Sequence, residues 1–227
     1  MEEQGPGVDA RTRVRRVPER GAYDKATINA ILDDALVGHV GFVADGFPYV
    51  IPMVVARRGD ELLLHGSTAS RLTRHLGTGA EVSVCVTHLD GLVVARSVFD
   101  NSMNYRSVIV FGRARAITAQ DEKLEALRTI VEHLLPGRWE ESRQPNDKEL
   151  RATAILAVPL DEASAKIRSG PPQDDEADVD LEVWAGELPL RLTPSAPRTD
   201  PEMRSDVPLP ESVRTFLSRS WQDGVER

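Results

Sequence analysis

The segment from His65 to Arg71 has the residue types that bind a phosphate group. It reads His-Gly-Ser-Thr-Ala-Ser-Arg and follows the apolar stretch that ends at Leu64. Backbone amides at a helix start carry partial positive charge, hydroxyl groups donate hydrogen bonds, and a guanidinium can hold two phosphate oxygens. The segment lacks the Gly-Lys-Ser/Thr signature of a P-loop. We therefore expect a phosphate-binding loop of another kind, and a plain serine cap is the competing interpretation.

A second segment rich in side-chain donors interrupts β-like sequence between residues 95 and 108. The competing interpretation is a long surface loop whose arginines are merely solvated. The five histidines show no metal-ligand spacing, so we predict no metal site. The single cysteine, Cys85, lies in an alternating stretch and is expected to be a small core residue.

Short strands joined by turns are expected around these segments. A helix should follow Asp24, a suitable N-cap. Residues 39–44 and 49–55 flank Asp45-Gly46 and predict a hairpin, in which Pro52 must lie at an edge, a bulge or an opening of the ladder. Residues 82–87 and 92–95 flank Leu89-Asp90-Gly91 and predict a second hairpin.

The second half of the chain continues this pattern. Residues 107–117 predict one long strand bent at Gly112, and Thr118 to Asp121 resembles the capping box of a helix that ends before Pro136-Gly137. Residues 154–160 and 163–167 predict two more strands, and residues 174–180 a solvated acidic loop. Strands without regular intervening helices favour an antiparallel barrel over a parallel α/β sheet.

Composition sets the domain organisation and excludes several partners. Prolines crowd toward both ends of the 227 residues, which predicts a flexible basic N-terminal arm over 1–21, one domain over 22–192, and a proline-rich tail with a short helix over 193–227. A net charge of -8 disfavours nucleic acid and anionic membranes. With no apolar run long enough to span a bilayer and no signal-peptide core, we expect a soluble cytoplasmic protein.

A series of motifs in this order resembles the pyridoxamine 5'-phosphate oxidase-like flavoproteins, in particular the branch with the nitroimidazole-resistance reductases. The motifs are His39-Val40-Gly41-Phe42, Tyr49-Val50-Ile51-Pro52-Met53, Leu64-His65-Gly66-Ser67, Ser70-Arg71, Leu89-Asp90-Gly91-Leu92-Val93, Ala95-Arg96-Ser97, Ser102 to Val108, and Phe111-Gly112. The resemblance spans about Tyr23 to Leu190. It implies a mainly β fold, an antiparallel split β-barrel that binds FMN, with a few flanking helices. It also implies a homodimer with each flavin in a groove between the subunits.

The resemblance assigns roles to individual positions. Strand backbone beside the isoalloxazine ring comes from Ile51, Pro52 and Met53. The loop at the FMN phosphate comprises Gly66, Ser67, Ser70 and Arg71, and His65 lies beside the flavin as the catalytic candidate. A second rim, which a partner subunit can supply, comprises Ser97, Asn104, Tyr105, Arg106 and Ser107. Trp184 is similar to a tryptophan that packs at the flavin in the oxidases.

The chain departs from the oxidases after that tryptophan. Their Arg-x-His is missing, and Glu187-Leu188-Pro189-Leu190 stands there instead, so charge-assisted bonds to a substrate phosphate are lost. We therefore predict an FMN-dependent oxidoreductase for another small molecule, with an electron donor such as NAD(P)H. The alternatives are a noncatalytic flavin carrier or flavin-linked regulator, and a haem-binding protein with a histidine ligand. FAD or a deazaflavin could also replace FMN.

Overall fold

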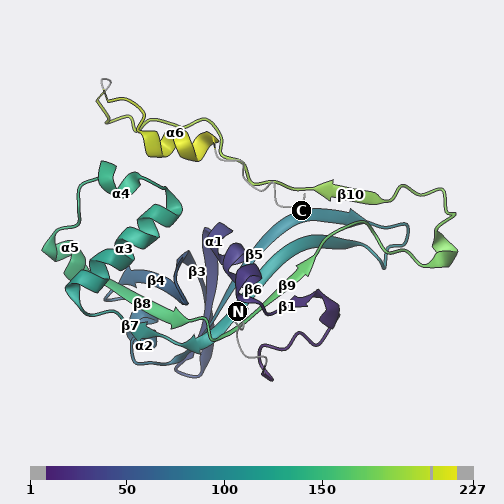
Figure 1. The fold of residues 1–227 in the computed structure, drawn as a ribbon, viewed down its shortest axis with the longest axis horizontal. Coiled ribbons are helices and arrows are strands. Elements are labelled where there is room, and N and C mark those ends of the chain that lie inside the picture. The colour runs from purple at the N-terminus through teal and green to yellow at the C-terminus, as the bar shows by residue number, and fades with distance from the viewer. Residues whose placement is uncertain (1–8, 205–206, 219–227) are drawn as a thin grey trace.

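The computed structural model describes residues 9–204 and 207–218, which form a mainly antiparallel sheet with flanking helices (Figure 1). The strands run in the order β1-β9-β6-β5-β2-β3-β4-β8-β7, and β10 pairs with β5. Their bounds are β1 Gly21–Ala22, β2 Val37–Ala44, β3 Phe47–Arg58, β4 Glu61–Ser67, β5 Glu81–Val94, β6 Ser102–Arg113, β7 Arg115–Ala116, β8 Thr153–Pro159, β9 Glu162–Arg168 and β10 Gly186–Pro189. The predicted fold class is confirmed.

The α-helices are α1 Lys25–Asp34, α2 Arg71–Leu76, α3 Gln120–Leu134, α4 Arg138–Glu141, α5 Asp147–Ala152 and α6 Glu211–Ser218. Short 3-10 turns cover Pro18–Arg20 and Glu176–Asp178. The sequence analysis missed α4 and α5, although Asn146 and Glu149 form a capping box at the start of α5. None of the helices in the described part of the chain is long and apolar enough to cross a membrane.

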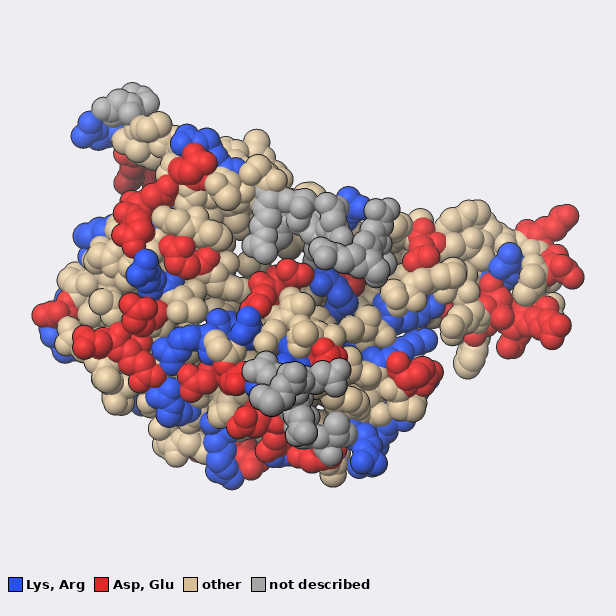
Figure 2. Space-filling model, in the orientation of Figure 1, with Lys and Arg blue, Asp and Glu red and all other residues tan. Residues whose placement is uncertain are grey.

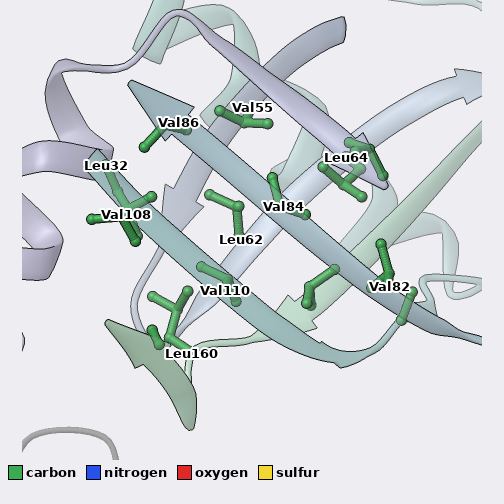
Figure 3. Packing of buried hydrophobic residues seen from close by; sticks show 14 of the residues in the cluster. Leu32, Val55, Leu62, Leu64, Val82, Val84, Val86, Val108, Val110 and Leu160 are labelled. Carbon is green, nitrogen blue, oxygen red and sulfur yellow. The ribbon is translucent and has the colours of Figure 1, made fainter. Parts of the chain in front are cut away.

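Alternating side chains build the main core inside the curved sheet (Figure 3). Val84, Val110, Leu62 and Leu64 all point into it, and α1 adds Leu32. Burial of each such side chain contributes about 1.5–3 kcal/mol. A smaller cluster lies on the other face of β4 and β8 and is covered by α3; its buried members are Ala56, Leu63, Ile117, Ala126, Ile130, Ile155 and Ala157. Two cores therefore fix β4 from both faces.

The first helix and the first hairpin form as predicted. The Asp24 side chain accepts a hydrogen bond from the Thr27 amide at 2.8 Å and caps α1. Asp45 and Gly46 have φ values of 53° and 79°, the left-handed values that a two-residue hairpin turn requires. This turn sets the register of β2 against β3, from Ala44↔Phe47 onward.

The predicted second hairpin is wrong, because residues 81–94 form one continuous strand, β5. Leu89-Asp90-Gly91 is a β-bulge opposite Asn104 and Tyr105, not a turn. The Asp90 carboxylate accepts hydrogen bonds from the Arg106 guanidinium on β6, with Nε and Nη2 both at 3.1 Å. An Asp-Gly pair suits a bulge as well as a turn, and this cross-strand ion pair holds the extended form.

Four smaller expectations also need correction. The predicted long strand is not continuous through residue 117, because β6 ends at Arg113 and the next strand, β7, pairs with β8. Helix α3 has the predicted extent, but its N-cap is Ala119 and no side-chain cap forms, so the capping box is wrong. The polar stretch after residue 95 is a loop only as far as Asn101, because Ser102 begins β6. Within the acidic loop, Asp174 is not solvated: its side chain is 4% exposed and pairs with Arg96 at 2.7 Å.

Beyond the bulge, β5 and β6 leave the barrel as a curved projection (Figure 1). We call residues 89–105, together with β10 and the segment 170–185, the arm. After β10, residues 190–200 carry no regular structure, and in α6 the Ser212 amide donates to Glu141 of α4 at 3.1 Å. At the other terminus, Arg11 pairs with Glu162 of β9. The proposed domain boundaries stay predictions, and residues 1–8, 205–206 and 219–227 of the predicted terminal segments lie outside the described residues.

Candidate functional site

Strands β3 and β4 separate and leave a gap in the sheet. They pair only from Val55↔Leu64 to Arg58↔Glu61. Before Val55, β3 stays paired with β2 alone, and beyond Leu64, β4 stays paired with β8 alone. Continuing the same register would place His65 opposite Val54, so the strands part at the predicted catalytic residue. We call this gap, bounded by residues 47–54 and 65–71, the split.

Two prolines decide which backbone groups of β3 face the split. Pro48 and Pro52 both pair with residues of β2, yet neither has an N–H to donate. They must therefore occupy non-hydrogen-bonded pairs, in which the polar groups of a residue point away from the partner strand. The same alternation turns the N–H groups of Val50 and Val54 toward the split. Pro52 thus lies at an edge, one of the three predicted settings.

This geometry changes which groups of β3 could touch a ligand. The backbones of Ile51 and Met53 point toward β2, and the Met53 side chain packs against the main core. The backbone groups of β3 that face the split are therefore those of Pro52, Val50 and Val54, of which the sequence analysis named only Pro52, and the roles of Ile51 and Met53 at a flavin stay predictions. The four-residue spacing of Pro48 and Pro52 within one strand was the signal that could have identified them.

His65 has a half-buried imidazole without a hydrogen-bond partner on one nitrogen. Its Nδ1 atom is buried and unpaired among the described residues. Burial lowers the pKa of His65 below its ordinary value of 6.5, so the ring is neutral at neutral pH. His65 pairs with Ile155 and shares its face of β4 with Leu63, whereas Gly66 faces Thr73 of α2.

The loop after β4 is rigid because its hydroxyl groups bond within it. The Ser67 hydroxyl accepts from the Ala69 amide at 3.2 Å, and the Ser70 amide donates to the Ser67 carbonyl at 3.0 Å. The Ser70 hydroxyl caps α2 by accepting from the Thr73 amide at 3.2 Å. Ser70 is therefore the N-cap of α2, and its role at a phosphate stays a prediction. Any further contact of Ser70 with a ligand must use the remaining capacity of the same oxygen.

Two arginines of α2 carry charges without carboxylate partners. The Arg71 guanidinium lies 4.8 Å from the centroid of the Tyr49 ring, which in turn stacks on Phe42. Arg74 donates to the Ser70 carbonyl at 3.4 Å. Within the described residues, neither forms an ion pair, although the chain is acidic and Arg57, Arg106 and Arg143 each pair with a carboxylate. An uncompensated cation held over an aromatic ring next to a rigid loop suits an anionic ligand.

The residues of the predicted second rim lie on β6 and the arm. Arg106 pairs with Asp90 and Asp34, and Ser107 donates to the Lys166 carbonyl at 3.1 Å. The Ser97 hydroxyl donates to Asp100 at 2.6 Å. These polar groups bond to neighbouring strands, to α1 and within the arm, and none of them hydrogen-bonds or ion-pairs with the segment His65 to Arg71.

The remaining predicted second-rim residues and Trp184 also contact parts of the arm or its neighbouring strands. Asn104 is buried and bonds Arg168 and Glu187, while Tyr105 is half-buried and pairs with Leu89. Trp184 is exposed, and its indole lies against Gly186. One copy of the chain therefore does not bring the second rim to the split, and its supply by a partner stays a prediction.

Comparison with known proteins places the chain in a family. Residues 24–167 match the family model described as pyridoxamine 5'-phosphate oxidase. The structure is similar to that of the flavocytochrome Anf3 from Azotobacter vinelandii, with 42% identity and a TM-score of 0.88 over 92% of this chain and 97% of that one. It is also similar to the FAD and heme binding protein from Mycobacterium smegmatis, with 40% identity and a TM-score of 0.84 over 87% of this chain and 97% of that one.

A third structure, a candidate 5-nitroimidazole antibiotic resistance protein from Bacteroides thetaiotaomicron, shares 25% identity and a TM-score of 0.55 over 65% of this chain and 86% of that one. No curated protein matches the chain significantly. The resemblance inferred from the motifs is confirmed by the family model, whose matched range contains the whole split. The chain belongs to the pyridoxamine 5'-phosphate oxidase family.

Proposed function

We propose that this chain binds FMN in the split and acts as a flavin-dependent oxidoreductase on a small molecule. The observation that carries the proposal is the open edge of β3 beside the uncompensated Arg71 and Arg74. A flavin ring carries hydrogen-bond donors and acceptors along one edge, which the N–H of Val50 and the carbonyl of Pro52 can match. The phosphate would lie at the loop 67–70, within reach of the α2 arginines.

The two most similar relatives described above support flavin binding, and an experiment must identify which flavin this chain binds. The flavocytochrome and the FAD and heme binding protein are each at least 40% identical to this chain. FAD is therefore the alternative to FMN. A true pyridoxamine 5'-phosphate oxidase is not proposed, because Glu187 and its neighbours stand where the oxidases have basic residues.

When bound, the flavin would supply the hydride or electron chemistry, and the protein would position the reactants. His65 would act beside the ring as a neutral donor or acceptor, because its lowered pKa keeps the imidazole uncharged at neutral pH. Its Nδ1 has no protein partner but is buried, so a substrate would approach the other ring nitrogen.

The proposed assembly is a homodimer that uses the outer face of the sheet, the side of β6, β5, β2 and β3 away from the main core. One row across this face reads Ile109, Cys85, His39, Pro52. Other exposed apolar side chains lie on the same face, farther along the strands on either side of this row: Val37, Val43, Val50, Leu89, Leu92, Met103 and Leu188. Exposed apolar side chains gathered on one face of a sheet are typical of a protein interface.

The test is a visible absorption spectrum of the purified protein, before and after incubation with FMN or FAD. We expect flavin bands, and mass measurement of the released cofactor identifies it. A protein that neither contains flavin nor gains it would overturn the proposal. Reduction by NAD(P)H followed by transfer to an added acceptor tests the oxidoreductase activity, and a reducible flavin without transfer favours the noncatalytic carrier.

Haem binding is a second candidate, favoured by the His65 imidazole. A neutral histidine is the form that ligates a metal, and the two relatives with at least 40% identity are a flavocytochrome and a FAD and heme binding protein. Reconstitution with haem should then produce a Soret band that His65→Ala loses and His39→Ala keeps. His39 is the matched control because it is exposed on β2. A Soret band unchanged in His65→Ala contradicts this assignment.

A further inference from the structure

Thr73 of α2 is a buried polar residue beside residues 67–70, which we call the phosphate loop. It is 5% exposed. Its hydroxyl lies 2.5 Å from the Ser67 carbonyl and 2.8 Å from the Ser70 hydroxyl. Its backbone amide also donates to that Ser70 hydroxyl at 3.2 Å. One residue outside the loop therefore bonds to both of its ends.

The number of available protons fixes the direction of these bonds. A carbonyl only accepts, so the single hydroxyl proton of Thr73 goes to the Ser67 carbonyl, which is nearer than the Ser70 carbonyl at 3.3 Å. The Ser70 hydroxyl must then be the donor in its contact with Thr73. A chain of two bonds runs from Ser70 through Thr73 to Ser67, and it leaves the Ser70 hydroxyl without a proton for a ligand.

The methyl group of Thr73 faces the end of β4. A Cβ at Gly66 would lie 3.1 Å from Thr73 Cγ2, a distance shorter than ordinary van der Waals contact. Helix α2 would have to move to admit a side chain at Gly66, which follows His65 directly. Thr73 thus sets the position of the phosphate loop with its hydroxyl and the distance between α2 and β4 with its methyl group.

Three other side chains keep donors that can reach a ligand. The Ser67 hydroxyl accepts from the Ala69 amide at 3.2 Å and retains its own proton. The Thr68 side chain is exposed, and neither of these two hydroxyls donates to another group in the described part of the chain. The Arg71 guanidinium, over the Tyr49 ring, supplies the third set of donors.

The stretch around the phosphate loop also lacks carboxylates that would compete with an anion. On the face drawn in Figure 2, basic and acidic side chains lie intermixed over the body of the molecule. Residues 62–80, in contrast, contain no Asp or Glu, although the chain has 36 of them. The donors of the loop therefore have no carboxylate in their own segment, which favours a bound phosphate over an internal ion pair.

We propose that Thr73 is the positioning residue of the phosphate loop. Its hydroxyl holds Ser67 and Ser70 in place and contacts no atom of the flavin. Ser70 supports the loop instead of donating to the phosphate, and the donors are Ser67, Thr68 and Arg71. This inference rests on the proposed function, and it changes the role that the resemblance assigned to Ser70.

Thr73→Val tests the proposal, because it removes the hydroxyl and keeps the branched shape. The full chain, freed of cofactor, is titrated with FMN and with riboflavin, which lacks the phosphate. We expect FMN affinity to fall about threefold to tenfold, the range for a neutral hydrogen bond. Riboflavin affinity should stay unchanged, and Thr73→Ser, which keeps the hydroxyl, should restore FMN affinity. An equal loss for both ligands, or no loss for FMN, overturns the proposal.

A matched control is Thr129→Val in α3. The Thr129 hydroxyl also donates to a backbone carbonyl, that of Glu125 at 2.9 Å, but it lies in another helix. This variant should bind FMN as the wild type does. Loss of affinity in Thr129→Val equal to that in Thr73→Val would show a general effect on the fold and overturn the assignment.

A double-mutant cycle tests the role of Ser70. Ser70→Ala and Thr73→Val both break the bond between these two side chains. The loss of FMN affinity in the double variant should therefore be smaller than the product of the two single losses. Losses that multiply would show that Ser70 has its own contact with the phosphate, and they would overturn this part of the proposal.

These results separate the inference from the proposed function. A wild-type protein that binds neither FMN nor FAD refutes the proposed function and the inference with it. FMN binding that does not depend on the Thr73 hydroxyl refutes the inference alone. A wild-type protein that binds riboflavin as tightly as FMN also refutes it, while the flavin site remains.

Discussion

The His65 imidazole couples the proposed site to the stability of the fold. Its pKa is lowered by burial, so the folded state binds this proton less readily than the unfolded state, whose pKa is near 6.5. The free energy of unfolding should therefore fall as the pH drops below about 6.5, and this loss is absent above that pH. One proton limits the slope to about 1.4 kcal/mol per pH unit, and partial exposure of the ring reduces it.

Urea denaturation at pH 7.5 and 5.5 measures this effect. His65→Gln should remove part of the pH dependence, because it removes the group whose pKa burial lowers. Carboxylates such as Asp24 and Glu61, whose pKa values lie below 3.8 and 4.5, titrate below this window. An unchanged slope in His65→Gln would show that the ring is solvated in the folded state.

Arg71 should contribute directly to cofactor affinity. Each charge-assisted hydrogen bond contributes about 1.5–3 kcal/mol, so Arg71→Ala is expected to weaken FMN or FAD binding by about tenfold or more. Fluorescence titration of the apoprotein measures this. Arg198→Ala, at an exposed position in the tail, is the control. Equal affinity of Arg71→Ala and Arg198→Ala would move the phosphate away from α2.

The residue types alone marked the segment His65 to Arg71 as a candidate site, but they did not show which hydrogen bonds form within it. The sequence places Ser70 at a helix start, but only the structure shows that its hydroxyl is already engaged by Thr73. The sequence also identifies Arg71 as a candidate from its residue type. Only the structure shows that the Tyr49 ring, from strand β3, lies beneath the guanidinium. Contacts between distant segments are what local patterns cannot supply.

At the scale of elements, the Asp-Gly pairs correctly marked β-structure, but they did not show where each strand ends. Asp45-Gly46 forms the expected hairpin, whereas Asp90-Gly91 forms a bulge within β5. The difference lies outside the dipeptide, because Arg106 pairs with Asp90 across the ladder and β10 packs on the strand. An Asp-Gly pair can therefore form either a hairpin turn or a bulge, and residues distant in sequence determine which one forms.

The bulge provides an element-scale prediction. A Cβ at Gly91 would lie 3.0 Å from the Leu188 carbonyl and 3.3 Å from Pro189 Cα, both in β10. Gly91→Ala should therefore push β10 off β5 at a cost of about 1–3 kcal/mol and speed amide exchange in residues 186–190. Gly112→Ala is the control, because its Cβ would meet nothing closer than 3.4 Å. Equal exchange in both variants would show that β10 adapts without strain.

At the scale of the whole molecule, the family and the barrel were predictable from the order of the motifs, but the arm was not. Its shape depends on the bulge and on the pairing of Asp174 with Arg96 across 78 residues of chain. The placement of His65 at the split depends on the point where β3 and β4 part, which no local sequence feature marks.

The dimer proposed on the outer face can be followed through Cys85, the single cysteine of the chain. Cys85 is half-buried on the outer face, mid-row between Ile109 and His39, so the prediction that it is a core residue is wrong. Its reaction with a thiol reagent should slow as protein concentration rises through the dimer range. Ile109→Asp should abolish this dependence by placing a charge in the interface, and Met203→Asp, an exposed tail position, should retain it. A rate independent of concentration in the wild type argues against this face.

The two prolines of β3 have one further consequence, for aggregation. An open strand edge is a template on which a foreign strand can add, and β3 keeps such an edge along residues 47–54. Pro48 and Pro52 remove two of the donors that an incoming strand would need, so the edge is a poor template for another chain. The protein can therefore leave this edge uncovered in the absence of a cofactor with less risk of forming fibrils.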